Sequence, residues 1–150
     1  MTIDWEKASR FAMPEESVGY LLWYVTHLWQ RRVDAALVEL DITHLQFVLL
    51  VGIGWLTRED NLVTQVQLSE FCRIDVMQIS QVARKLEVKK LIKRSVHPSD
   101  TRAKVLFLTR IGETTLQQAL PVVEHLDAKF FGSCNHVALL AELQQLHSKS

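Results

Sequence analysis

The side chains best suited to bind a charged ligand lie between Arg84 and Arg110. This segment contains nine lysines and arginines and two acidic residues, a net charge of 9 − 2 = +7. The whole chain has 17 basic and 17 acidic residues, so the remainder carries 8 − 15 = −7. This asymmetry indicates a cationic face that can contact phosphates, and an ordinary solvated surface is the alternative.

The elements that must position this charge are predicted to form a winged helix-turn-helix over residues 62–110. Thr43–Gln46, before this module, and Thr64–Gln67, within it, have the spacing of a capping box that starts a helix. Asp75 starts the next helix after a turn of two residues, and residues 91–109 have the pattern of a β-hairpin. In such a module the second helix can enter a DNA major groove.

Helical arms are predicted on both sides of this module, at residues 14–61 and 111–147. Apolar residues recur in both at spacings of three and four, and Pro121 predicts a kink in the second arm. Residues 1–13 lack this periodicity and are expected to form a loose arm. The predicted fold is thus one mainly α domain with a small β-hairpin. Because long apolar helices exceed what a small core can cover, we expect the arms to pair with a second copy.

The sequence does not indicate an enzyme, a membrane protein or an exported protein. It lacks a Gly-rich phosphate loop, a nucleophile elbow and paired acids at functional spacing, and no cofactor is expected. The longest apolar run without a charge, around residues 47–56, is too short to span a bilayer, and the N-terminus lacks an apolar signal core. We therefore expect a cytoplasmic protein without a membrane partner.

Metal and thiol chemistry are weakly supported. Asp41 and His44 are a close pair of metal-ligand type at helical spacing, but no H-x3-H or Cys-x2-Cys spacing appears, so no metal site is expected. Cys72 and Cys134 do not form a disulfide framework. Cys72 is expected to be inert within the helix-turn-helix core, and Cys134 to be exposed in a loop.

Several short motifs along the winged helix are typical of one family. They are Leu68-Ser69-Glu70, Ile74-Asp75, Ile79-Ser80, Leu86-Glu87, Leu91-Ile92, Arg94, Asp100-Thr101-Arg102, Leu108-Thr109 and Gly112. With them the chain resembles the multiple-antibiotic-resistance regulator (MarR) family of bacterial transcription factors over residues 18–146. It departs from the family at Lys90, where a glycine is usual. Lysine must there adopt a left-handed backbone, at about 1 kcal/mol, or end the helix in another way.

The resemblance implies a homodimeric repressor that binds pseudo-palindromic operators in double-stranded DNA. The early positions of the second helix are then expected at base edges: Val76, Met77, Gln78, Ser80, Gln81 and Arg84. Glutamine can pair bidentately with adenine, and serine can serve most bases or a phosphate. The two apolar residues can contact thymine methyl groups, and the arginine can reach a phosphate or a guanine.

The hairpin is expected to contact the DNA backbone and the minor groove. Arg102 at its tip should enter the minor groove, with Asp100 holding its guanidinium. Lys93, Arg94 and Lys104 should add phosphate contacts that raise affinity without reading sequence.

The resemblance also implies an effector pocket between the helical arms and the winged helix, often for small aromatic acids. The candidate residues are Trp23, His27, Arg31, His44, Phe47 and Trp55, of which Arg31 can face a carboxylate. Core or dimer contacts are the alternative role for the aromatic residues. Two other functions stay open: a redox- or metal-responsive regulator of the same fold, and a winged-helix module that binds protein instead of DNA.

Overall fold

Helices account for most of the computed structural model, which describes residues 2–149, and a single two-stranded antiparallel sheet completes this described part. In chain order the elements are α1 (Trp5–Ala8), the 3₁₀ turn η1 (Pro14–Glu16), α2 (Val18–Ala36), the 3₁₀ turn η2 (Val38–Leu40), α3 (His44–Leu56), α4 (Gln65–Cys72), α5 (Val76–Val88), β1 (Ile92–Val96), β2 (Lys104–Leu108), α6 (Arg110–Phe130) and α7 (His136–His147). The predicted fold class is confirmed.

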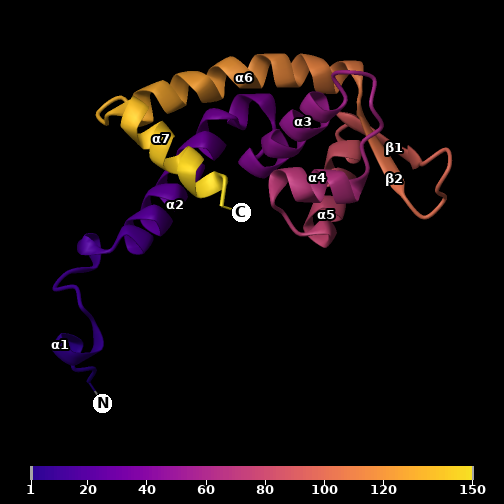
Figure 1. Cartoon of the computed structure of the whole chain (residues 1–150). Coiled ribbons are helices and arrows are strands. Elements are labelled where there is room, and N and C mark those ends of the chain that lie inside the picture. Colours follow the sequence, from indigo (N-terminus) through magenta and orange to yellow (C-terminus); the bar gives the residue numbers. More distant parts are fainter. Residues whose placement is uncertain (1, 150) are drawn as a thin grey trace.

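A single apolar core holds α3, α4, α5 and the hairpin together as a winged helix (Figure 1). Its fully buried side chains come from each of these elements and include Leu49, Ile53, Leu68, Ile79, Leu86 and Leu106. Burying each large aliphatic side chain contributes about 1.5–3 kcal/mol, so this core carries most of the stability of the module.

The sheet pairs β1 with β2 in a register that runs from Ile92 opposite Leu108 to Val96 opposite Lys104. The loop before α4 pairs with β2 through one isolated bridge, between Thr64 and Val105. The Leu106 N–H also donates to the Val63 carbonyl at 2.8 Å.

Both predicted capping boxes are confirmed. The Thr43 hydroxyl accepts the Gln46 N–H at 3.1 Å, and the Gln46 side chain accepts the Thr43 N–H at 3.2 Å. Thr64 and Gln67 make the same reciprocal pair at 3.2 and 2.9 Å. The first long helix, by contrast, begins later than expected. Pro14 opens only the turn η1, and the Ser17 hydroxyl then caps α2.

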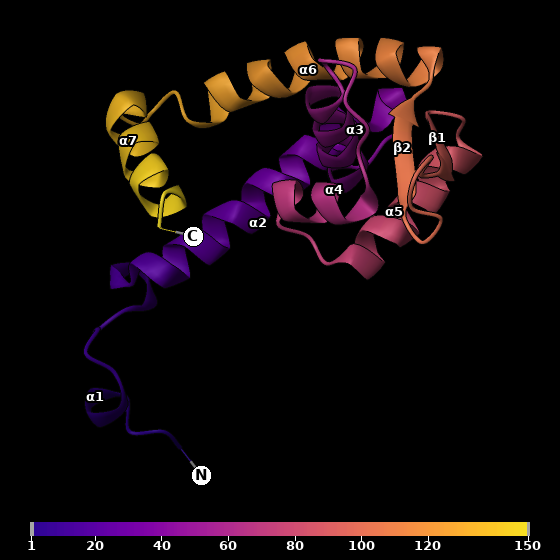
Figure 2. The ribbon, with the colours of Figure 1, turned by 45° about the vertical axis from the view of Figure 1, so that its right-hand side comes forward.

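The helix α6 runs along the winged helix, whereas α2 packs on α3 and α6 near its C-terminal end and extends away from the winged helix; α7 turns back from the end of α6 toward the N-terminal half of α2 (Figures 1 and 2). Many large apolar side chains are exposed on these two elements: Val18, Tyr20, Leu21, Leu22, Trp23, Tyr24 and Val25 on α2, and Val137, Leu140, Leu143 and Leu146 on α7. Pro121 lies inside α6, as the sequence indicated. Among residues 2–149, no helix is both long and apolar enough to cross a bilayer.

Candidate nucleic-acid interface

The second helix of the motif, α5, begins at a capped turn and buries one face. Asp75 is the N-cap, and its carboxylate accepts the Met77 N–H at 2.8 Å. The inner face packs on the core through Ile79, Val82, Ala83 and Leu86. Of the residues predicted to read bases, Val76, Met77, Gln78, Gln81 and Arg84 are exposed and Ser80 is half-buried. Met77 keeps 71% of its surface exposed, so it has no packing role within this chain.

The turn between α4 and α5 fixes the angle of the two helices. Arg73 ends α4 with a left-handed backbone, φ 54°. The Ser69 hydroxyl donates to the Ile74 carbonyl at 2.5 Å, and the Ile74 N–H donates to the Ser69 carbonyl at 3.1 Å. Below the turn, α3 approaches α4 closely, since a Cβ on Gly52 would lie 2.6 Å from Leu68 Cδ1. Little freedom is left for α5 to move relative to α4.

The hairpin tip is a turn held by local hydrogen bonds. The Ala103 N–H donates to the Asp100 carbonyl, and the His97 N–H donates to the Ala103 carbonyl, each at 3.0 Å. The Asp100 carboxylate accepts the backbone N–H of Arg102 at 3.0 Å. We expected it to hold the Arg102 guanidinium, but the ion pairs within residues 2–149 include none between these two side chains. Asp100 therefore shapes the turn, and Arg102 is exposed at its end.

The three predicted phosphate contacts of the hairpin differ in accessibility. Lys93 and Lys104 are exposed. Arg94 is instead tied to the C-terminal half of α5, because Glu87 lies 2.5 Å from its Nη2 and 2.6 Å from its Nε. A third contact joins Arg94 to Gln65 on α4 at 3.4 Å. Arg94 thus joins the hairpin to both helices of the motif, a role that competes with the predicted phosphate contact.

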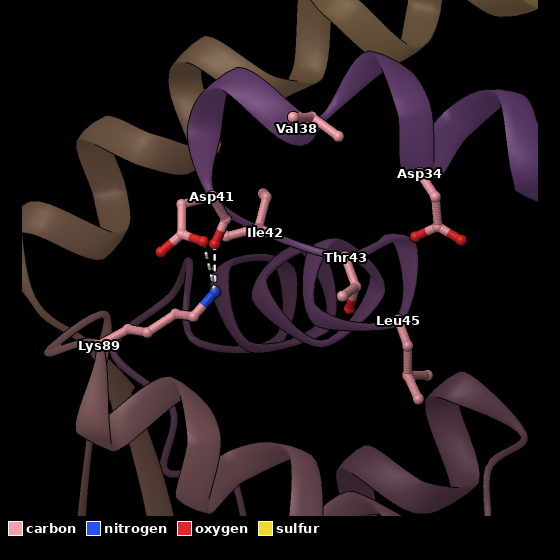
Figure 3. Close-up of a pocket in the computed structure, with 7 residues that line it drawn as sticks. All are labelled: Asp34, Val38, Asp41, Ile42, Thr43, Leu45 and Lys89. Atoms are coloured by element: carbon pink, nitrogen blue, oxygen red, sulfur yellow. Dashed lines mark hydrogen bonds and ion pairs between the residues drawn. The ribbon is translucent and has the colours of Figure 1, made fainter.

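Lys89, at the C-cap of α5, turns away from the hairpin toward the turn between α2 and α3 (Figure 3). Its Nζ donates to the Asp41 backbone carbonyl, lies 3.3 Å from the Asp41 carboxylate, and donates to the Gln46 side-chain oxygen at 3.3 Å. From the sequence, Lys89 was recognised only as one of the basic residues of the cationic segment. Its partners are more than 40 residues away in the chain, so no local pattern could reveal them.

Lys90 takes the backbone conformation that favours glycine. Its φ is 61°, and it follows the end of α5. The Lys90 N–H donates to the Glu87 carbonyl at 2.8 Å, and the Leu91 N–H donates to the Leu86 carbonyl at 2.9 Å. This is the Schellman arrangement that closes many helices. Of the two outcomes considered for this lysine, the chain adopts the strained one.

Thr109 joins the end of the hairpin to the start of α6. Its hydroxyl accepts the Gly112 N–H at 3.0 Å and donates to the Lys90 carbonyl at 2.6 Å. Its backbone N–H donates to the Leu91 carbonyl at 3.0 Å. Gly112 lies so close to this strand end that a Cβ there would be 1.9 Å from the Leu91 oxygen. Thr109 is thus the N-cap of α6, and close contact requires a glycine three residues further on.

Three of the expected effector residues lie on α2. The rings of Trp23 and His27 are 4.3 Å apart, and the His27 Nδ1 lies 2.7 Å from the Trp23 carbonyl oxygen. Both are exposed, as is Arg31 one turn further along the helix. These residues form a surface and not a pocket within the single chain.

The other three lie on α3 and have separate surroundings. Phe47 is buried in the core. Trp55 is exposed near the C-terminal end of α3, with the Arg58 guanidinium 4.0 Å from its ring centroid. His44, at the first turn, packs edge-on against Trp29 at 4.8 Å. The pocket in Figure 3 is lined by none of the six expected effector residues.

His44 lies at the junction of α2, α3 and α6. Burial lowers the pKa of His44, and the nearby carboxylates Asp34 and Asp127 partly offset this effect. Asp34 accepts the His44 backbone N–H at 2.6 Å, and Asp127 accepts the Trp29 indole N–H at 2.7 Å. Each carboxylate also accepts a hydrogen bond from another donor, and the lowered pKa favours the neutral form of the imidazole at this junction.

The cysteines show little sign of redox chemistry. Burial raises the pKa of the Cys72 thiol to about 11, so this side chain stays protonated near neutral pH. Cys134 is exposed in the link between α6 and α7, as expected. A metal site would require at least three histidine, cysteine or acidic side chains close together. The described part of the chain contains no such cluster.

A helix-turn-helix with an exposed polar outer face beside a basic hairpin defines a winged-helix DNA-binding protein. No family model matches the chain. It is 42% identical over 139 residues to the uncharacterized HTH-type transcriptional regulator YdcH of Bacillus subtilis (strain 168), covering 92% of this chain and 95% of that protein. The chain belongs to the MarR family of DNA-binding transcriptional regulators.

Solved structures share this fold. A mutant of MarR from E. coli complexed with operator DNA is 26% identical, with a TM-score of 0.75, covering 88% of this chain and 91% of that one. BpsR of Bordetella bronchiseptica, from a study of how 6-hydroxynicotinic acid regulates its DNA binding, is 23% identical with a TM-score of 0.80. That match covers 94% of this chain and 97% of that one.

Proposed function

We propose that the protein is a homodimeric repressor that binds pseudo-palindromic operator DNA and is released by a small aromatic carboxylate. The observation that carries the DNA-binding part is that two exposed surfaces suited to contact DNA lie on one rigid module. One is the outer face of α5, with Gln78 and Gln81, and the other is the hairpin tip with Arg102. The similar E. coli protein complexed with operator DNA supports the same use of the fold.

The two surfaces, the outer face of α5 and the hairpin tip, have different chemistry. The first turns of α5 carry apolar and amide side chains suited to base edges in the major groove. Arg102 carries the charge suited to the narrow, negative minor groove beside it. Lys93 and Lys104, exposed on the hairpin strands, add phosphate contacts. We infer that α5 sets the sequence preference and that the hairpin supplies much of the affinity.

Homodimer formation is supported by the apolar side chains on α2 and α7. Trp23 keeps 60% of its surface exposed and Val137 keeps 78%, and neither helix shields the other within one chain. Contiguous apolar surface of this kind is typical of an interface. A second copy related by twofold symmetry would cover it and would place two α5 helices at successive half-sites. Sedimentation equilibrium of the whole chain tests this part.

The effector part is supported by Trp23, His27 and Arg31, which lie along one exposed stretch of α2. Aromatic rings and a guanidinium are the groups that an aromatic carboxylate requires. Because these residues are exposed in one chain, the pocket would be completed by the second copy. The relation of BpsR to 6-hydroxynicotinic acid, itself an aromatic carboxylic acid, supports this ligand class.

The test of DNA binding is selection of bound fragments from the source genome, followed by affinity measurements for wild type and Arg102→Ala. We expect the substitution to weaken binding about tenfold at moderate salt, because a minor-groove contact is lost. Arg110→Ala is the matched control, since Arg110 is exposed but lies at the start of α6, away from the tip. Equal binding by Arg102→Ala and wild type would contradict the assignment of the hairpin.

A further inference from the structure

The C-terminal end of the recognition helix α5 is held to the dimerisation arm by one lysine. We refer to the three polar interactions of Lys89 Nζ, with the Asp41 carbonyl, the Asp41 carboxylate and the Gln46 side chain, as the Lys89 contacts. Figure 3 shows the lysine reaching across to the turn that follows α2. The side chain is 29% exposed, so its ammonium is partly withdrawn from solvent.

Two of the three acceptors of the Lys89 contacts belong to ordered parts of the backbone and core, whereas the Asp41 carboxylate is 90% exposed. Gln46 is almost fully buried, and its side-chain oxygen also accepts the Thr43 N–H within the capping box of α3. Asp41 is the C-cap of η2 with a left-handed backbone, φ 51°, and its carbonyl accepts a hydrogen bond from the Lys89 ammonium. A charge-assisted hydrogen bond to such preset acceptors defines a position better than a contact between two mobile side chains.

The position of Lys89 matters because of where it lies on α5. This helix contains 13 residues, a length of about 20 Å at the usual rise of 1.5 Å per residue. If the helix tilts about its Lys89 end, Gln78 near the other end is therefore displaced, and the displacement grows with the distance between the two residues. Base contacts are hydrogen bonds that weaken steeply once their geometry is lost.

We infer that Lys89 is a positioning residue for operator binding: through Asp41 and Gln46 it sets the orientation of the recognition helix relative to α2. This inference rests on the proposed DNA-binding function and adds a route from the dimer arm to the DNA. In this role Lys89 contributes no phosphate contact of its own, although it belongs to the basic segment of the sequence.

The test compares Lys89→Met with wild type on the selected operator fragment at several salt concentrations. Methionine keeps an aliphatic stem and removes the ammonium. We expect a loss of affinity of about tenfold, because a charge-assisted contact is removed. The slope of the logarithm of the binding constant against that of salt concentration should be unchanged, whereas loss of a phosphate contact lowers the slope by about 1. Lys89→Arg retains a cation and should recover most of the loss.

Lys90→Met is the matched control, since it removes the same charge from the next, exposed residue. It should change affinity less than about twofold, with any change falling on the salt slope. If Lys89→Met does not fold, Asp41→Asn gives a second test. Charge alone predicts that this variant binds DNA more tightly, because a negative group is lost. The Lys89 contacts predict two- to threefold weaker binding, because the cation loses one partner.

The outcomes are distinct. Wild-type affinity in Lys89→Met, a reduced salt slope in that variant, or tighter binding in Asp41→Asn would each overturn the inference. Weaker binding at an unchanged slope, with recovery in Lys89→Arg, supports it. A wild-type chain that binds no genomic fragment would instead refute the proposed function and leave the packing of Lys89 as a structural feature only.

Discussion

Replacing Lys90 by glycine should stabilise the protein. Lys90 has φ 61°, a conformation that costs a residue with a Cβ about 1–2 kcal/mol and costs glycine nothing. Glycine also loses more freedom on folding, which offsets about 0.4–1 kcal/mol of this gain. The side chain is exposed, and no packing is lost with it. We therefore expect Lys90→Gly to raise the free energy of unfolding by about 0.5–1 kcal/mol.

The measurement is urea or thermal unfolding at one fixed protein concentration, because dimer formation would couple stability to concentration. A gain of this size corresponds to a rise in Tm of about 1–4 °C for a chain of this length. Lys85→Gly is the matched control, since Lys85 is an exposed lysine within the same helix. It should lose about 0.7 kcal/mol through helix propensity. A loss of stability in Lys90→Gly as well would show that the left-handed backbone carries no strain.

Two further predictions concern packing and pH. Gly112→Ala should lose about 3 kcal/mol of unfolding free energy, because its Cβ would lie 1.9 Å from a backbone oxygen that must then move; denaturant titration with an unchanged m value checks this, and wild-type stability would contradict the close contact. His44 has a lowered pKa, so the unfolded chain binds the proton more readily. Its contribution is complete above the unfolded pKa of about 6.5 and decreases as pH falls through the folded value. The free energy of unfolding should therefore decrease less between pH 8 and pH 5 in His44→Gln than in wild type. An equal decrease in both proteins would show that His44 does not contribute to the pH dependence.

Local chemistry was predictable from the sequence, and pairing across the fold was not. The capping boxes at Thr43 and Thr64 depend on residues three positions apart, so their spacing is visible in the chain. The unusual position of Lys90 was also visible, because the residue after a helix end often needs a left-handed backbone, but the sequence left two outcomes open and only the structure shows the strained one. The later start of α2 was missed, since a proline followed by two glutamates fits either an α-helix or a short 3₁₀ turn.

The candidate site shows the same limit. The exposure of Gln78 and Gln81 followed from helical periodicity. The partner of Asp100 did not, because a turn offers both a backbone N–H and a guanidinium at almost the same separation. The pairing of Arg94 with Glu87 depends on how a strand returns along a helix, which periodicity does not specify. Lys89 depends on contacts still further away in the chain.

The ion pairs of Lys89 and Arg94 affect how such a regulator searches a genome. Together they occupy two of the nine basic side chains of residues 84–110 with partners inside the protein. Sequence-independent attraction to DNA grows with the number of phosphates neutralised, so under the proposed function the chain should hold random DNA more weakly than its composition suggests. The expected consequence is shorter residence on wrong sites and faster sampling of new ones, with the time spent at an operator depending more on base contacts.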